Sequence, residues 1–301
     1  MTRTVAVTGA TGFIGSALLP RLTAAGWQVR ALTRRPQPAR AGVFWVQGAL
    51  DDRAALATLV DNTEAVVHLA GAVRGADAKA FQAVNVQGTG NLIDVCQQQR
   101  FLLVSSLAAR EPALSWYADS KHRAEQVLAT SALAWTILRP TAVYGPGDQE
   151  LKPLLALTRK GWLPLISTPD ARLGLIHVAD VVSAMLAWLE RGEHSPGQTL
   201  ELDDGRPGGY THQTLAALLS EFWRRPVRVL AVPAWPLRGI AWANVALARL
   251  FHYAPMLSPG KVNELRHADW TANIEPARQA LGFVPEMDFL ASLHHTFESP
   301  R

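Results

Sequence analysis

Tyr117 and Lys121, four residues apart, are the side chains of this 301-residue chain best suited to acid–base chemistry. Residues at this spacing share one face of an α-helix. A free phenol has a pKa of about 10, too high for proton exchange at neutral pH, but a neighbouring ammonium favours the phenolate and lowers that pKa. The pair can therefore exchange a proton with a carbonyl oxygen while a hydride is added to or removed from the carbon.

Polar residues on two neighbouring segments belong with this pair. Ser105 and Ser106 end the apolar run that begins at Phe101, which predicts a buried strand, and a serine hydroxyl there can hold a carbonyl oxygen. Asn85 lies in the helical segment before that strand. An ordinary helix surface pair is the alternative for Tyr117 and Lys121, but their place at the start of the next helix favours catalysis.

The first fifteen residues predict a cofactor site. The β-branched run 4–8 leads into Gly9, Gly12 and Gly15, which let a strand-to-helix turn tighten and let its backbone approach a ligand. The free N–H groups and positive dipole end of the following helix would face an anion, such as the pyrophosphate of a dinucleotide. An ordinary βα turn is the alternative.

The end of the second predicted strand favours NADP over NAD. Arg34 and Arg35 follow Thr33, where an acidic residue would bind the adenosine ribose and repel a 2′-phosphate. Guanidinium groups can pair with that phosphate instead, although two solvated arginines are the alternative. Asp51 or Asp52 could contact the adenine or cap a helix.

Apolar runs alternate with amphipathic helices up to about residue 140, which predicts an α/β fold with a Rossmann-type doubly wound parallel sheet. A smaller, mainly helical C-terminal lobe should bind substrate. We expect residues 1–147, with 172–203 returning, to form the dinucleotide-binding domain, and 148–171 with 204–301 to form the lobe. Strands are expected at 4–8, 27–33, 43–48, 65–69, 101–105, 135–139, 173–176 and 199–202. Helices are expected at about 16–25, 51–60, 78–98, 117–130, 151–160, 179–189, 211–222, 236–251 and 290–297.

Composition narrows the function. The net charge of +4 is a mild, scattered excess, so nucleic acid is not an expected partner. The single cysteine, Cys96, excludes an internal disulfide and fits a reducing compartment, and the sequence suggests no metal site. The N-terminus lacks a secretory signal, so we expect a cytoplasmic protein. The apolar stretch 229–251 is interrupted by prolines and arginines, which argues against a spanning helix and leaves peripheral membrane contact open.

These motifs together resemble the extended short-chain dehydrogenase/reductase superfamily, the NAD-dependent epimerase/dehydratase-like group. The resemblance runs from residue 4 to about 185. It rests on Thr8-Gly9-x-x-Gly12-x-x-Gly15, His68-Leu69-Ala70-Gly71, Asn85-Val86-x-Gly88-Thr89, Ser105-Ser106, Tyr117-x-x-x-Lys121, Arg139-Pro140-x-x-Val143-Tyr144-Gly145-Pro146-Gly147 and His177-Val178-x-Asp180-Val181.

The resemblance implies roles for individual residues. Tyr117 resembles the general acid/base, Lys121 the residue that holds the nicotinamide ribose, Ser106 the hydroxyl that orients the carbonyl, and Asn85 a proton-relay or structural residue. His68, and His177 with Asp180, resemble structural positions. The implied cofactor-binding set is Gly9, Thr11, Gly12, Phe13, Ile14, Gly15, Thr33, Arg34, Arg35, Asp51, Leu69, Ala70, Gly71, Asn85, Ser105, Tyr117, Lys121, Pro140 and Val143.

Departures from the family pattern narrow the reaction. Leu107 and Ala108 follow the serines where sugar-nucleotide dehydratases carry an acid pair, and the interval to Tyr117 is short for a sugar-nucleotide epimerase. We therefore expect an NADP(H)-dependent oxidoreductase that acts on a lipophilic or aromatic carbonyl or secondary alcohol. A nucleotide-sugar epimerase that cycles NAD and a non-catalytic, cofactor-bound sensor or assembly subunit are the alternatives.

The late helix 236–251 has more apolar residues than one packed face requires. The surplus must meet a small-molecule substrate, a second subunit or a membrane, and we favour the substrate mouth. A homodimer is suggested by the resemblance, because family members often pair through the helices that include Asn85 and Tyr117.

Overall fold

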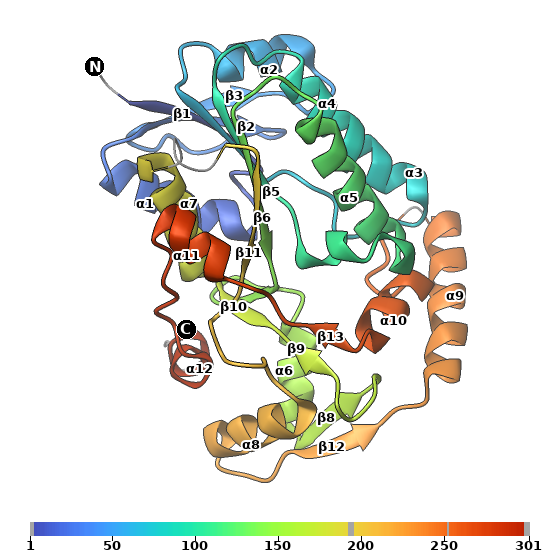
Figure 1. Ribbon diagram of the computed structural model, residues 1–301. Coiled ribbons are helices and arrows are strands. Elements are labelled where there is room, and N and C mark those ends of the chain that lie inside the picture. The colour runs from blue at the N-terminus through green and yellow to red at the C-terminus, as the bar shows by residue number, and fades with distance from the viewer. Residues whose placement is uncertain (1–2, 192–195, 252, 298–301) are drawn as a thin grey trace.

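The computed structural model describes residues 3–191, 196–251 and 253–297. A seven-stranded, all-parallel sheet lies at its centre, in the order β11-β6-β5-β4-β1-β2-β3 (Figure 1). The strand order reverses between β1 and β4, which is where open α/β sheets bind ligands at the carboxyl ends of their strands. The strands are β1 (Thr4–Thr8), β2 (Gln28–Thr33), β3 (Val43–Gln47), β4 (Ala65–His68), β5 (Arg100–Val104), β6 (Trp135–Pro140) and β11 (Gln198–Leu202).

Helices cover both faces of this sheet (Figure 1). The central strands are buried on both sides, as their continuous apolar sequences require. One face carries α1 (Phe13–Ala24), α7 (Val178–Arg191) and α11 (Glu275–Leu281). The other carries α2 (Arg53–Val60), α5 (Trp116–Ala129) and a helical segment made of α3 (Ala78–Phe81), a π-helix (Gln82–Gln87) and α4 (Gly88–Ile93). The predicted Rossmann-type doubly wound fold is confirmed.

A second group of elements lies beyond the carboxyl ends of β6 and β11 (Figure 1). Its core includes Tyr144, Tyr210, Phe222 and Phe289. Three short parallel pairs belong to it: β7 (Ala142–Tyr144) with β10 (Leu175–His177), β8 (Trp162–Leu165) with β12 (Arg228–Ala231), and β9 (Arg172–Leu173) with β13 (Asp269–Trp270). Its helices are α6 (Lys152–Arg159), α8 (His212–Trp223), α9 (Ala234–Phe251), α10 (Pro259–Arg266) and α12 (Phe289–Phe297).

Several expected elements differ from those observed. The helix expected over 78–98 ends at Ile93 and contains the π-helix, and the strand expected over 173–176 is divided into β9 and β10. Strands β7, β8 and β12 were not expected, because runs of three or four residues give little alternation. The expected boundaries between the two lobes stay a prediction.

Asp180 ties α7 to the segment that precedes α12. Its carboxylate accepts hydrogen bonds from the backbone N–H groups of Glu286 and Met287, each at 3.1 Å. His177 Nδ1 accepts the N–H of Ala179 at 3.2 Å. Both side chains are buried, so the pair acts here as a structural link. In the part of the chain that the structure describes, no helix is both long and apolar enough to cross a bilayer.

Candidate active site

The turn after β1 and the start of α1 leave no room for a side chain at Gly9 or Gly15. Gly9 has φ +68°, and a Cβ there would lie 2.6 Å from the backbone nitrogen of Ala70. A Cβ on Gly15 would lie 2.2 Å from the Gly9 oxygen. Helix α1 then begins after Gly12 with neither a capping side chain nor an acidic residue in its first turn. The turn therefore presents bare backbone at a positive helix end, which fits the pyrophosphate of a dinucleotide.

His68, at the end of β4, connects β1 to the helical segment that carries Asn85 and Thr89 through a chain of buried hydrogen bonds. Its Nδ1 lies 2.6 Å from Thr8 Oγ1, and its Nε2 lies 3.0 Å from Thr89 Oγ1. Thr89 donates to the Asn85 carbonyl, and Thr8 accepts the N–H of Ala70. These partners assign the proton to Nε2 and leave Nδ1 as the acceptor of the Thr8 hydroxyl. Burial, helped by the Lys121 charge, lowers the pKa of His68 to about 3.

This neutral histidine predicts a stability loss in acid. Between pH 6.5 and about 3 the unfolded chain binds a proton at His68 that the folded chain does not, so stability falls as pH falls through that range. From pH 7 to 5 this group should cost about 2 kcal/mol in urea unfolding. We expect His68→Gln to be less stable at pH 7 but to lose this part of the pH dependence. Parallel curves for variant and wild type would show that His68 is not the group responsible.

Asn85 joins the loop after β4 to α5. Its Oδ1 accepts the N–H of Ala72 at 2.7 Å, and its Nδ2 donates to the Ala72 carbonyl at 3.0 Å and to Ser120 Oγ at 2.8 Å. Ser120 Oγ donates in turn to the Tyr117 carbonyl. Asn85 lies in the π-helix, whose turns contain about one residue more than those of an α-helix. This wider turn accompanies the position of the Asn85 amide between the loop and α5. These bonds favour the structural role of Asn85 over the relay role.

The side chains of Tyr117 and Ser106 lie together at the carboxyl end of β5, close enough for the Ser106 hydroxyl to influence the pKa of the phenol. Ser106 also caps a 3-10 helix by accepting the N–H of Ala108. Phe81 packs beside the phenol, with ring centres 6.2 Å apart. The pKa of Tyr117 differs from the expected lowering: burial raises it to about 12, although the Ser106 hydroxyl lowers it. The ligand-free phenol is therefore protonated at neutral pH and able to donate a proton.

Lys121, one helical turn after Tyr117, is buried. Its Nζ donates to the Val104 carbonyl at 2.9 Å, and burial lowers its pKa to about 8. Glu125, one turn further along α5, opposes that lowering. The Glu125 carboxylate is held by Arg139 through two hydrogen bonds, from Nε at 3.0 Å and Nη2 at 2.5 Å. Arg139 thus connects β6 to the helix that carries the tyrosine.

The loop after β4 lies against Asn85 and Lys121. A Cβ on Gly71 would lie 3.2 Å from Asn85 Oδ1 and 3.6 Å from Lys121 Nζ, so a close backbone approach brings β4 and α5 together. Ser105 Oγ is buried among these strand ends with no hydrogen-bond partner within the protein. An orphaned hydroxyl at this edge fits a polar ligand group, since such groups are normally satisfied. The residues present therefore fit a dinucleotide.

Other expected cofactor residues lie around the same sheet edge. Thr33 ends β2, and its hydroxyl donates to the Arg35 carbonyl at 2.7 Å while Arg34 and Arg35 extend into solvent. Asp52 caps α2 by accepting the N–H of Ala55, whereas Asp51 is exposed. The remaining members lie on the turn after β1 (Thr11), at the start of α1 (Phe13, Ile14), on the loop after β4 (Leu69, Ala70), or at the end of β6 and on β7 (Pro140, Val143).

Two residues at this edge were missed by the sequence reasoning. Glu264, on α10, is buried, is hydrogen-bonded to Ser115 at the start of α5, and raises the pKa of Tyr117. Thr141, directly after β6, has a buried hydroxyl without a partner within the protein. Glu264 lies 149 residues from Ser115, so no local pattern could have indicated it.

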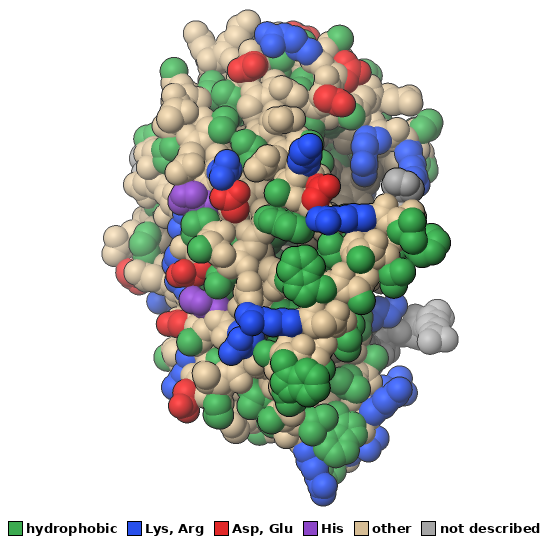
Figure 2. All heavy atoms as spheres, turned by 90° about the vertical axis from the view of Figure 1, so that its right-hand side faces the viewer, with side chains coloured by type: hydrophobic (Ala, Val, Ile, Leu, Met, Phe, Trp, Pro, Cys, Tyr) green, Lys and Arg blue, Asp and Glu red, His purple; other side chains and the backbone are tan. Residues whose placement is uncertain are grey.

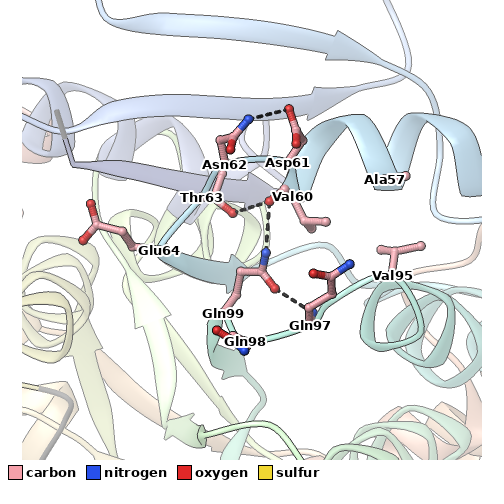
Figure 3. Close-up of a pocket in the computed structure, with 10 residues that line it drawn as sticks. All are labelled: Ala57, Val60, Asp61, Asn62, Thr63, Glu64, Val95, Gln97, Gln98 and Gln99. Carbon is pink, nitrogen blue, oxygen red and sulfur yellow. Dashed lines mark hydrogen bonds between the residues drawn. The ribbon is translucent and has the colours of Figure 1, made fainter. Parts of the chain in front are cut away.

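A surface hollow of about 440 Å³ lies elsewhere (Figure 3). Its lining comes from residues 60–64 before β4 and 97–99 before β5, with Gln99 bonded to the Val60 carbonyl. These are the amino ends of the strands, at the edge opposite to Tyr117. The hollow is therefore separate from the candidate active site.

Comparison with known proteins identifies the family of the chain. A model of the NAD-dependent epimerase/dehydratase family matches residues 5–202. A ceramide reductase of Caulobacter vibrioides is 34% identical, covering 98% of this chain and 93% of its own. A 2-alkyl-3-oxoalkanoate reductase of Stenotrophomonas maltophilia is 30% identical, covering 94% and 95%. The solved structure of MoeE5 in complex with UDP-glucuronic acid and NAD has a TM-score of 0.75 at 23% identity, covering 98% of each chain.

The chain therefore belongs to the NAD-dependent epimerase/dehydratase family. It is an NAD(P)-dependent enzyme, and the members of its family include oxidoreductases and epimerases. The likeness to MoeE5 concerns the fold alone.

Proposed function

We propose that this enzyme transfers a hydride to or from the carbonyl carbon of a lipophilic or aromatic substrate and uses NADP(H). The observation that carries the proposal is the closeness of the Tyr117 phenol and the Ser106 hydroxyl at the sheet edge that also holds the glycine turn. The activities for which the two reductase relatives are named support a substrate with an aliphatic part.

The proposed mechanism assigns one task to each residue. A bound nicotinamide dinucleotide would supply or accept the hydride. Ser106 donates a hydrogen bond that positions the substrate oxygen, and Tyr117 gives that oxygen its proton in the reductive direction. A protonated phenol suits this direction. Lys121 would hold the nicotinamide ribose, and its charge would favour the phenolate left after proton transfer.

An assay of net cofactor use tests the proposal. Purified enzyme with NADPH would be offered long-chain 3-oxo compounds and steroid ketones beside nucleotide sugars. The proposed function predicts steady loss of the reduced nicotinamide absorbance with a carbonyl compound. Interconversion of sugar nucleotides without net cofactor change would instead establish the epimerase alternative. Leu107 and Ala108, directly after Ser106, still supply no acid or base for dehydration.

Arg34 and Arg35 should set the cofactor preference. Both side chains are exposed at the end of β2, next in the sheet to the strand that carries the glycine turn. A charge-assisted hydrogen bond to a 2′-phosphate should make NADP(H) bind about ten- to a hundredfold more tightly than NAD(H). In calorimetry, replacing both arginines by alanine should remove that difference and spare NAD(H) binding. The exposed Arg40→Ala is the matched control, and equal dissociation constants in the wild type would refute the assignment.

A further inference from the structure

Helix α9 exposes an apolar surface and buries small residues. The side chains buried along it are Ala241, Val245 and Ala248. At about 100° per residue, large apolar side chains occupy the opposite half of the helix, and only glycine, alanine and proline lie between them there. This α9 apolar arc consists of Trp235, Ile240, Trp242, Leu247, Leu250 and Phe251. The exposed fractions of Trp235 and Leu250 are 79% and 69%, so these side chains pack little against the residues that the structure describes.

The arc faces away from the molecule. Helix α9 lies at the outer edge of the fold (Figure 1), and its inner side packs on α10. Figure 2 views this edge: hydrophobic and basic side chains lie together over its lower part. The substrate mouth expected at this helix from the sequence stays a prediction. A continuous exposed apolar surface of this kind marks an interaction site.

The charged side chains of the segment that carries the arc have one sign. Residues 222–263 contain five arginines and one lysine but neither aspartate nor glutamate, so the basic excess is concentrated here and not scattered. Arg238 and Arg249 lie on one flank of the arc. At the start of β12, on the same segment, Arg225 and Arg228 line a hollow of about 350 Å³ together with Lys160 and Trp162.

This charge pattern disfavours a second copy of the chain as the occupant. A two-fold contact brings the same surface of both copies together, so the arginines would face arginines without an acidic partner from this segment. An anionic bilayer surface supplies the missing negative charge. Tryptophans and arginines beside an apolar helix face are typical of helices that lie in the membrane interface.

We propose that α9 docks the enzyme onto an anionic membrane surface, with the α9 apolar arc buried among the lipids. Only α10 separates the docked helix from the candidate active site. It packs on α9, and its Glu264 bonds to Ser115 at the start of α5. Docking would thus bring the entrance of the site to the bilayer. The inference is independent of the proposed reaction, since vesicle binding is measured without substrate.

Vesicle flotation tests the proposal with matched variants. The full chain should float with phosphatidylcholine vesicles that contain phosphatidylglycerol and should be released by salt. Leu250→Glu should lower the partition coefficient by about tenfold or more, and Arg238→Gln by about fivefold. Val284→Glu, at a similarly exposed aliphatic position outside α9, should bind like the wild type.

Three results would overturn the proposal. The first is a wild-type protein that stays unbound with anionic vesicles. The second is equal binding by Leu250→Glu and Val284→Glu. The third is a dimer, seen by light scattering, that Leu250→Glu dissociates while vesicle binding is absent, which would assign the arc to a second copy. Unchanged thermal unfolding of each variant checks that the fold is intact.

Discussion

Replacing Tyr117 by phenylalanine lowers turnover by about 10² to 10⁴, while the affinity for the cofactor stays close to that of the wild type. The substitution removes a proton donor and leaves the ring, so the packing against Phe81 is kept. The contact of the Ser106 hydroxyl with the phenol oxygen is lost. Steady-state turnover on the reactive carbonyl, together with calorimetry of cofactor binding, separates the two effects.

Tyr253→Phe is the matched control for this variant. It also removes one phenol oxygen, which is hydrogen-bonded to Asn244 far along the chain from the strand ends. Its turnover on a water-soluble substrate should equal that of the wild type. Wild-type turnover by Tyr117→Phe would remove the proposed acid/base from the mechanism.

Glu125→Gln should lower the free energy of unfolding by about 3 to 5 kcal/mol. The Glu125 carboxylate is almost fully buried, and its loss leaves the Arg139 guanidinium charged, largely buried and without its counter-ion. The same change removes the charge that supports protonated Lys121, so the pKa of Lys121 should fall further. Urea unfolding measures the first effect, and the pH dependence of cofactor binding measures the second.

Asp119→Asn provides the control on the same helix. It also converts a carboxylate to an amide beside an arginine, Arg123, but that pair is largely in solvent. An exposed pair of this kind contributes less than about 1 kcal/mol. Similar losses in the two variants would mean that burial does not set the value of the Glu125–Arg139 pair.

The central sheet could be predicted because each of its strands is recognisable from a few consecutive residues. Buried parallel strands are short apolar runs, and Gly9 and Gly15 are spaced as a tight turn requires. The Tyr117 helix follows the strand that ends in Ser105 and Ser106, so local order alone placed these groups at one edge.

The rest depends on contacts between distant segments. β7 is a strand only because it pairs with β10, which lies more than thirty residues later. The Glu264 carboxylate likewise bonds to Ser115 from a distant part of the chain. The pKa of Tyr117 also depends on burial, which no spacing between residues reveals. The α9 apolar arc was detectable as surplus hydrophobicity, but its outward direction required the packed structure.

The bond between Ser115 and Glu264 has a consequence for the order in which the site is completed. A ribosome makes the strands and the tyrosine helix first, and the carboxylate that anchors the start of that helix is synthesised 149 residues later. Asn263, its neighbour, likewise donates to the Leu114 carbonyl. The nascent chain can therefore build its nucleotide-binding sheet early, but Tyr117 reaches its final setting only when α10 has left the exit tunnel and docked.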